Sequence, residues 1–347
     1  MSKKVFVAMS GGVDSSVAAA LMVEKGYEVT GVYMKNWSQD LPGHYCPWQE
    51  DYSDAKRVAV QLGIKFKMYD FEKQYRRKVV DYMINEYKLG RTPNPDIMCN
   101  QEVKFKLFLN TALEDGADYI ATGHYARNIK GELWVALDKN KDQSYFLCRV
   151  DKAALKKTFF PVGEYSKVEI RKMAADRGLI TAKKKDSQGI CFIGKVSIKE
   201  FLSQYVKASV GEIIDQNKKI VGKHDGAIFY TIGQRQGLNV GGGLAYYVVG
   251  KDIEKNQVFV TTDLQDKRLW SKKIHLTQIH WIDKLKSHHT NLYLRTRYRA
   301  SLIKITKINV TPNQASVDLE SEVRAVTPGQ SAVIYNGDQL LGSGIVV

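Results

Sequence analysis

The chain has 347 residues, of which 52 are Lys or Arg and 37 are Asp or Glu, so its formal net charge is +15. Its length suggests two or three domains, and its 44% hydrophobic and 26% charged residues exclude a disordered chain, a collagen and a coiled coil. No run approaches the roughly 18 apolar residues of a membrane span. We expect no signal or transit peptide, because an apolar run follows almost directly on the first residues. The positive charge favours a polyanionic partner, either nucleic acid or a membrane surface.

The first third of the chain alternates short apolar runs with helical patterns. The predicted strands are Val5–Met9, Glu28–Met34, Ile64–Tyr69 and Asp118–Ala121, and the predicted helices are Asp14–Lys25, Glu50–Leu62, Glu72–Lys88 and Lys104–Glu114. This alternation predicts a parallel sheet with helices on both faces, in which ligands bind at the carboxyl ends of the strands. We expect loops over Asn36–Trp48 and Leu89–Asn100, the second because prolines flank Asn94.

The rest of the chain changes from helical to β-rich. We expect helices over Lys167–Gly178 and Ser197–Val206, separated by a loop at 183–194 that leads into a short strand. A glycine-containing connector, Tyr230–Gly243, lies within the β-rich part. The predicted strands there are Gly211–Ile214, Tyr246–Val249, Gln257–Thr261, Ile274–Ile282, Asn291–Tyr298, Leu302–Val310, Ala315–Leu319 and Ala332–Tyr335. Their spacing is typical of a small sandwich or barrel.

A glycine- and serine-rich motif, SGGVDSS at 10–16, lies between the first predicted strand and the first predicted helix. Two glycines let the backbone approach a phosphate, and the helix N-terminus offers free N–H groups. Asp14 could cap the helix or hold magnesium. The motif lacks the Lys-Ser/Thr pair of a Walker A loop and is not GxGxxG. A plain glycine turn with a serine cap is the alternative.

Four cysteines are too few for a disulfide scaffold, so we expect a reducing, cytoplasmic environment. Cys99 precedes a helical pattern, and Cys191 follows the basic run Lys183–Lys185; both settings favour a thiolate. For Cys148 and Cys46, packing is the favoured interpretation. Three or four cysteines could hold an iron–sulfur cluster, but their spacing gives no positive support for one, and no motif indicates zinc.

These motifs carry a resemblance to a known family. SGGVDSS resembles the pyrophosphate loop (PP-loop) of the N-type ATP pyrophosphatases, which transfer AMP to a carbonyl oxygen. Together with RTPNPDIMCN, ATGHYAR, KDQSYFL, KKDSQGICFIG, YTIGQRQGL and RAVTPGQSAV, it resembles the bacterial-type tRNA-specific 2-thiouridylases over nearly the whole chain.

The resemblance implies an α/β fold that starts with a Rossmann-like, adenine nucleotide alpha hydrolase-like PP-loop domain. A small central β-rich module and a C-terminal β-barrel would follow. We expect the catalytic domain at 1–205, with a helical part that contacts tRNA at about 140–205. The central connector would span 206–270, and the tRNA-binding barrel 271–347.

The resemblance also implies functional residues. Cys99 would be the nucleophile, Cys191 the persulfide carrier and Asp96 the acid/base, with Asn94, Pro95 and Asp96 receiving the target base. The ATP-binding residues would be Ala8, Met9, Ser10, Gly11, Gly12, Val13, Asp14, Ser15, Ser16, Met34 and Gly123. The tRNA contacts would be His124, Lys141, Asp142, Gln143, Arg297, Tyr298 and Gln330.

The family reaction replaces the 2-oxygen of the wobble uridine (position 34) in the tRNAs for Lys, Glu and Gln with sulfur. It implies ATP, with magnesium held through the ATP phosphates rather than at a certain protein site. A persulfide on Cys191 would supply the sulfur, either directly or as hydrosulfide released by Cys99, and both routes end in a Cys99–Cys191 disulfide. A cysteine desulfurase or a sulfur-relay protein would be the donor. We expect a monomer without membrane contact.

A basic segment supports a tRNA partner. Residues 272–310 carry nine Lys or Arg and one acid, Asp283. If Asn291–Tyr298 is a strand, Arg295 and Arg297 share one face with Tyr293 and, beyond its end, Arg299, which suits a phosphate backbone. A barrel face kept soluble by charge is the alternative.

Two other functions use part of this pattern. An amide-forming ligase of the same ATP class would need the loop but neither cysteine nor the basic β-rich part. A non-catalytic RNA-binding protein on a degenerate nucleotide domain would not need the intact SGGVDSS motif.

Overall fold

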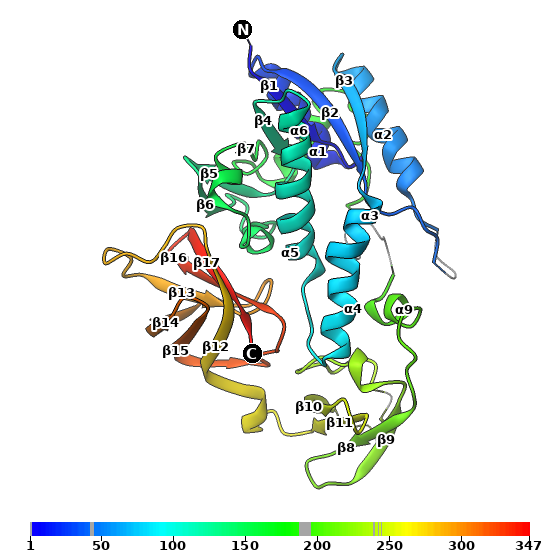
Figure 1. Cartoon of the computed structure of the whole chain (residues 1–347), viewed down its shortest axis with the longest axis vertical. Coiled ribbons are helices and arrows are strands. Elements are labelled where there is room, and N and C mark those ends of the chain that lie inside the picture. The colour runs from blue at the N-terminus through cyan, green and yellow to red at the C-terminus, as the bar shows by residue number, and fades with distance from the viewer. Residues whose placement is uncertain (1, 42–44, 187–195, 239, 242, 244) are drawn as a thin grey trace.

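The computed structural model describes residues 2–41, 45–186, 196–238, 240, 241, 243 and 245–347. Its first part is a five-stranded parallel sheet in the order β3-β2-β1-β4-β7. The strands are β1 (Lys4–Ala8), β2 (Glu28–Lys35), β3 (Lys65–Asp70), β4 (Tyr119–Thr122) and β7 (Thr158–Phe159). The expected doubly covered α/β sheet is therefore confirmed (Figure 1).

Alternation along β1 explains why both faces of the sheet are covered. Val5 and Val7 belong to one hydrophobic cluster, whereas Phe6 and Ala8 belong to another. The first cluster includes residues of three helices, α1 (Val13–Glu24), α2 (Trp48–Gln61) and α8 (Lys167–Asp176). The second includes the helical segments that follow β3 and precede β4.

Those segments form two long helical rods that contain π-helical turns. The first comprises α3 (Glu72–Tyr75), η1 (Arg76–Val80) and α4 (Asp81–Lys88), as expected for 72–88. The second comprises α5 (Pro95–Cys99), η2 (Asn100–Phe108) and α6 (Leu109–Glu114). The expected loop over Leu89–Asn100 is thus wrong from Pro95 onward: Asn94 caps a helix whose first residue is a proline, a position that proline favours. The rods run from the sheet toward the β modules (Figure 1).

The central module is a small four-stranded sheet in the order β10-β11-β8-β9. Its strands are β8 (Gly211–Ile214), β9 (Ile220–His224), β10 (Tyr247–Asp252) and β11 (Gln257–Thr261). Two short helical turns flank it, η4 (Ala227–Phe229) and η5 (Lys267–Leu269), and α9 (Ile198–Leu202) precedes it.

The C-terminal part is a six-stranded barrel in the order β12-β15-β14-β13-β16-β17, closed by pairing of β12 with β17. Its strands are β12 (Trp270–Trp281), β13 (Leu292–Arg295), β14 (Ile303–Val310), β15 (Gln314–Arg324), β16 (Ser331–Asn336) and β17 (Gln339–Val346). The expected strand Asn291–Tyr298 ends at Arg295, and β17 was not predicted.

A hairpin from the first part of the chain extends the barrel sheet. β5 (Ala126–Ile129) pairs with β6 (Glu132–Val135), and β6 pairs with β17 through Leu133 and Leu340. The turn η3 (Ser144–Leu147) and α7 (Lys152–Leu155) follow the hairpin. Strand pairing thus connects a hairpin that follows β4 of the parallel sheet to the barrel. No helix among the described residues is long and apolar enough to cross a membrane.

Candidate active site

The SGGVDSS motif forms the turn between β1 and α1, at the carboxyl end of the sheet. β1 lies between β2 and β4, so the turn occupies the switch point where such folds bind ligands. Gly12 is the N-cap of α1 and has no side-chain cap, which leaves the first N–H groups for a ligand. Gly11 adopts a φ of +73°, and a side chain there would collide with the carbonyl oxygen of Asp51.

Serine hydroxyls shape this loop from within. Ser15 Oγ accepts the Ser10 N–H at 3.1 Å, and the hydroxyls of Ser15 and Ser16 donate to Gly12 O at 3.1 and 2.8 Å. Both hydroxyls are buried. These bonds fix the shape of the loop, while the N-cap of α1 itself has no side-chain hydrogen bond.

Asp14 does not cap the helix, contrary to one of the two expectations. Its carboxylate accepts hydrogen bonds from the Tyr125 hydroxyl at 2.8 Å and from the Lys167 ammonium group at 2.7 Å. The carboxylate of Asp14 therefore has the Lys167 ammonium group as its cationic partner. Among the described residues, no group of three or more His, Cys, Asp or Glu side chains is arranged to hold a metal ion.

The residues expected to contact adenosine lie at the ends of the neighbouring strands. Met34 is buried near the end of β2, and Ala8 and Met9 are buried at the end of β1. Gly123 follows β4, and a Cβ added to it would lie 2.7 Å from Ser15 N. Only a glycine lets the backbone after β4 approach the phosphate loop this closely.

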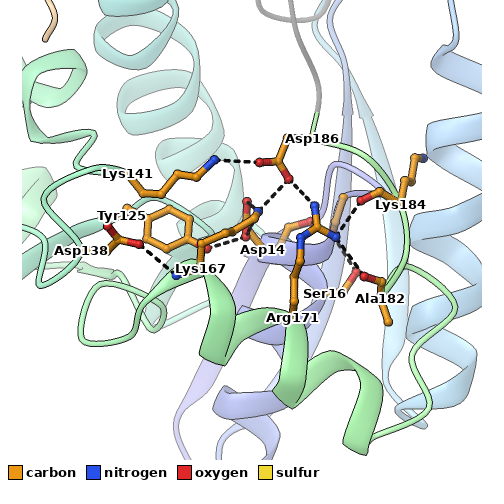
Figure 2. A network of polar contacts seen from close by, with 12 residues as sticks. Asp14, Ser16, Tyr125, Asp138, Lys141, Lys167, Arg171, Ala182, Lys184 and Asp186 are labelled. Atoms are coloured by element: carbon orange, nitrogen blue, oxygen red, sulfur yellow. Dashed lines mark hydrogen bonds and ion pairs between the residues drawn. The ribbon is translucent and has the colours of Figure 1, made fainter.

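A polar network extends from Asp14 to the segment that precedes Cys191 (Figure 2). The Lys167 ammonium nitrogen lies 2.9 Å from a carboxylate oxygen of Asp186, which also contacts Lys141 at 3.0 Å and Arg171 at 2.7 Å. Lys167 and Arg171 project from α8, which begins at the capping box of Ser166. Sequence reasoning did not single out Lys167 or Arg171, because only the fold brings α8 beside α1.

Cys99 lies inside a helix rather than at a helix N-terminus. The Asn94 side chain accepts the N–H groups of Asp96 and Ile97 at 3.1 and 3.2 Å, so the helix begins one turn before Cys99. Cys99 therefore does not occupy the helix N-terminus that the sequence pattern predicts, and its thiolate character stays a prediction. Cys99 is fully buried, and Asp96 lies three residues earlier, on the same helix face.

Cys191 lies outside the described residues, as do the expected strand and most of the loop at 183–194. The described residues on either side of this segment, Asp186 and Val196, both contact the rest of the protein. Asp186 belongs to the polar network, and Val196 is buried in a large cluster that also contains Cys99. Lys184 forms ion pairs with Asp51 and Asp54 of α2 at 2.7 and 2.6 Å.

The other two cysteines agree with the packing interpretation. Cys46 and Cys148 are both buried free thiols. Burial raises the pKa of both thiols, to about 11 for Cys148. Both remain protonated near neutral pH, which does not suit a nucleophile.

The residues expected to contact tRNA occupy several environments. Burial, together with the charge of Lys104, holds the pKa of His124 well below its usual value, so its ring is neutral. Its Nδ1 lies 2.6 Å from the Thr122 hydroxyl and its Nε2 lies 3.5 Å from Lys104 Nζ. The Gln143 side chain accepts the Tyr125 N–H at 3.0 Å.

Asp142 is a buried structural acceptor. It accepts hydrogen bonds from the Ala136 N–H at 3.0 Å and the Ser144 hydroxyl at 2.9 Å, and burial raises its pKa. Arg295 lies 3.7 Å away and compensates part of its charge.

The expected row of exposed arginines on one strand is wrong. β13 ends at Arg295, whose guanidinium lies over the Tyr335 ring. Arg297 turns inward and donates hydrogen bonds to Ile232 O at 2.7 Å and to the Thr327 hydroxyl. Only Arg299 of the three is exposed.

Tyr298 and Gln330 lie near the second rod. The Tyr298 ring packs on Phe146, with centroids 4.4 Å apart. The Gln330 amide donates to Thr92 O at 2.8 Å, just before Asn94. The barrel therefore contacts the segment that leads to Cys99.

Three family models match the chain in succession. They are the tRNA methyl transferase HUP domain over residues 3–195, the tRNA methyl transferase PRC-barrel domain over 199–262 and the aminomethyltransferase beta-barrel domain over 271–346.

Curated relatives match the full length. The tRNA-specific 2-thiouridylase MnmA of Bacillus subtilis is 47% identical over 99% of this chain and 94% of its own length. The proteins of the same name from Enterococcus faecalis and Shigella dysenteriae are 44% and 47% identical, each over 99% of this chain and over 95% and 97% of their own lengths. The chain belongs to the family of tRNA-specific 2-thiouridylases.

Proposed function

We propose that this chain is an ATP-dependent tRNA sulfurtransferase. It converts the wobble uridine of the tRNAs for Lys, Glu and Gln to 2-thiouridine and releases AMP and pyrophosphate. The observation that carries the proposal is its 44–47% identity to 2-thiouridylases over 99% of the chain. The phosphate loop at the switch point of the parallel sheet supplies the physical basis.

The loop would bind MgATP as substrate. The uncapped N–H groups at the start of α1 suit the phosphates, while Met34 and Gly123 would border adenine and ribose. Attack of the uridine O2 on the α-phosphorus would form an O–P bond and release pyrophosphate. Adenylation turns that oxygen into an AMP leaving group, and the loop would stabilise the departing negative charge.

Sulfur would then arrive as a persulfide on Cys191. In one route its terminal sulfur attacks C2, the C2–O bond breaks and AMP leaves. The Cys99 thiolate then attacks the Cys191 sulfur, breaks the S–S bond and leaves the thiocarbonyl. In the other, Cys99 first releases hydrosulfide, which attacks C2. In both, the two thiols lose two electrons to the transferred sulfur and end as a disulfide, which an external thiol reductant must reduce.

The start of α5 would receive the target base. The side-chain oxygen of Asn94 accepts the hydrogen bonds that cap α5, so we propose that Asn94 orients this helix. Pro95 and Asp96 would border the base. Asp96 would move the proton during activation, one helical turn from Cys99. The uridine would have to leave the anticodon stack to reach this position.

The remaining expected residues divide by their contacts. We propose that His124, Lys141, Tyr298 and Gln330 contact tRNA, because they border the phosphate loop or the second rod. Asp142, Gln143 and Arg297 would support that surface through their internal hydrogen bonds.

The proposed organisation keeps catalysis in residues 1–205, a connector at 206–270 and tRNA binding at 271–347. A cysteine desulfurase or a relay protein would load Cys191. We propose a monomer acting in the cytoplasm, where its substrates tRNA and ATP occur.

Incubation with unmodified tRNA, MgATP and a persulfide donor tests this function. Wild-type protein should form 2-thiouridine, whereas Cys99→Ala and Cys191→Ala should lose it. Cys46→Ala, another buried free cysteine, is the matched control and should retain it. Full product from either of the first two variants would overturn the cysteine assignments, and no product from wild type would overturn the function.

A further inference from the structure

One ammonium group joins the phosphate loop to Asp186. Lys167 Nζ lies 2.7 and 2.8 Å from the two carboxylate oxygens of Asp14 and 2.9 Å from Asp186 Oδ1. The Lys167 side chain is only 12% exposed, so this contact is largely shielded from solvent. A carboxylate that follows α8 in sequence is thereby held beside the loop that binds ATP phosphates in the proposed function.

Asp186 has three cationic partners. Besides Lys167, its oxygens contact Lys141 at 3.0 Å and Arg171 at 2.7 Å (Figure 2). In these ion pairs, three cationic side chains contact the two carboxylates of Asp14 and Asp186. Convergent Lys and Arg donors around one small anion also suit a phosphate group, because charge-assisted hydrogen bonds bind carboxylate and phosphate alike.

Further hydrogen bonds fix the positions of Arg171 and Lys167. Arg171 uses Nη1 to donate to the carbonyl oxygens of Ala182 and Lys184, both at 3.0 Å, and thereby directs Nη2 toward Asp186. Lys167 is fixed at the first turn of α8, where its N–H donates to Asp138 at 3.0 Å. These donors would remain in position if another anion replaced Asp186.

Asp186 is a permanent anion under ordinary conditions. Partial burial tends to raise its pKa, but hydrogen bonds from Lys167 and Lys141 outweigh it and lower the pKa to about 2. The carboxylate therefore stays negatively charged beside its three cationic partners near neutral pH.

We propose that Asp186 is an internal anion that occupies part of the polyphosphate position in the ATP-free protein. When ATP binds, Lys167 and Arg171 exchange this carboxylate for phosphate oxygens, so both are ATP-binding residues. This inference rests on the proposed function, since it assumes that ATP binds at the SGGVDSS loop. The inference adds that the Asp186 carboxylate competes with ATP, and with the pyrophosphate product, for Lys167 and Arg171.

Competition and simple structural support predict opposite results for Asp186. If Asp186 competes with phosphate, Asp186→Asn should bind ATP more tightly, because the cations lose their internal partner. If Asp186 only orders the cations, the same variant should bind more weakly. Lys167→Met should weaken binding by about tenfold or more, as expected for a lost charge-assisted hydrogen bond. Lys167→Arg should restore part of it.

Titration calorimetry with inorganic pyrophosphate and with MgATP, on the full chain without tRNA, tests the inference. We expect about tenfold tighter pyrophosphate binding for Asp186→Asn and weaker binding for Lys167→Met and Arg171→Met. Lys139→Met and Asp338→Asn break an exposed ion pair of similar length, 3.1 Å, and serve as matched controls. Unchanged or weaker binding by Asp186→Asn would overturn the proposal, as would unchanged binding by Lys167→Met.

A second titration with unmodified tRNA separates the two sources of phosphate. If Asp186→Asn tightened the binding of tRNA but not of pyrophosphate, the cluster would serve the tRNA backbone and the proposal would fail. Wild-type thiolation is measured separately. Pyrophosphate binding with the expected signs but without 2-thiouridine would contradict the proposed function and leave this inference standing.

Discussion

Gln330 of the barrel donates a 2.8 Å hydrogen bond from its side-chain amide to the carbonyl oxygen of Thr92, two residues before the N-cap of α5. The Thr92 N–H in turn donates to Pro328 O at 2.8 Å. A barrel loop thus holds the segment that enters the helix of Cys99. This contact links the part proposed to bind tRNA with the part proposed to perform the chemistry.

Replacing Gln330 tests this link. Gln330→Ala should lower kcat/KM for tRNA about fivefold, since one lost hydrogen bond costs about 1 kcal/mol. ATP binding without tRNA should not change. Gln314→Ala, at an exposed position of the same barrel, is the matched control. Equal effects of the two substitutions on tRNA kinetics would contradict the link.

Gly123 allows the backbone after β4 to approach the phosphate loop closely. In Gly123→Ala the new Cβ would lie 2.7 Å from Ser15 N, so the loop must shift and ATP should bind about tenfold more weakly. Binding of a non-hydrolysable ATP analogue measures the effect. Gly241→Ala, where no atom lies within 4 Å of the added Cβ, should leave binding unchanged. Wild-type affinity in Gly123→Ala would argue against this position for ATP.

Arg297 and Arg299 should respond differently to substitution. Arg297→Ala leaves Ile232 O without its donor and should lower the free energy of unfolding by roughly 1–3 kcal/mol. Arg299→Ala removes an exposed charge, so it should leave stability unchanged and reduce the salt dependence of tRNA binding. Chemical denaturation and tRNA titrations at several salt concentrations measure both. Reversed effects would show that Arg297 serves tRNA directly.

Lys251 should make stability depend on pH. Burial lowers its pKa from 10.5 to about 8, while its ammonium group donates to Tyr230 O at 2.6 Å. Between these two pKa values the unfolded chain binds more protons at this lysine, so its contribution to the unfolding free energy rises with pH. Lys251→Met should lack that rise. A difference between wild type and variant that stays constant from pH 8 to 10.5 would contradict the assignment.

Local patterns predicted the sheet well, because its apolar runs alternate with amphipathic helices and the SGGVDSS turn sits between the first pair. The start of α5 was missed for an equally local reason. Prolines on both sides of Asn94 predict a loop, but a capping asparagine followed by proline is also a helix start.

Other features depend on contacts between distant segments. The pairing of β6 with β17 joins residues about two hundred positions apart, and no local sequence pattern predicts it. The contacts of Lys167 with Asp14 and Asp186 likewise require α8 to pack on α1. Arg297 was expected on an exposed strand, because period-two alternation says which residues share a face but not where the strand ends.

A single turnover without reductant tests the central claim most directly. Protein carrying a persulfide on Cys191 is mixed with MgATP and unmodified tRNA, and the nucleosides, nucleotides and cysteine-containing peptides are measured by mass spectrometry. The account predicts one 2-thiouridine, one AMP, one pyrophosphate and one Cys99–Cys191 disulfide per active protein. Formation of 2-thiouridine without that disulfide, or without AMP, would contradict it.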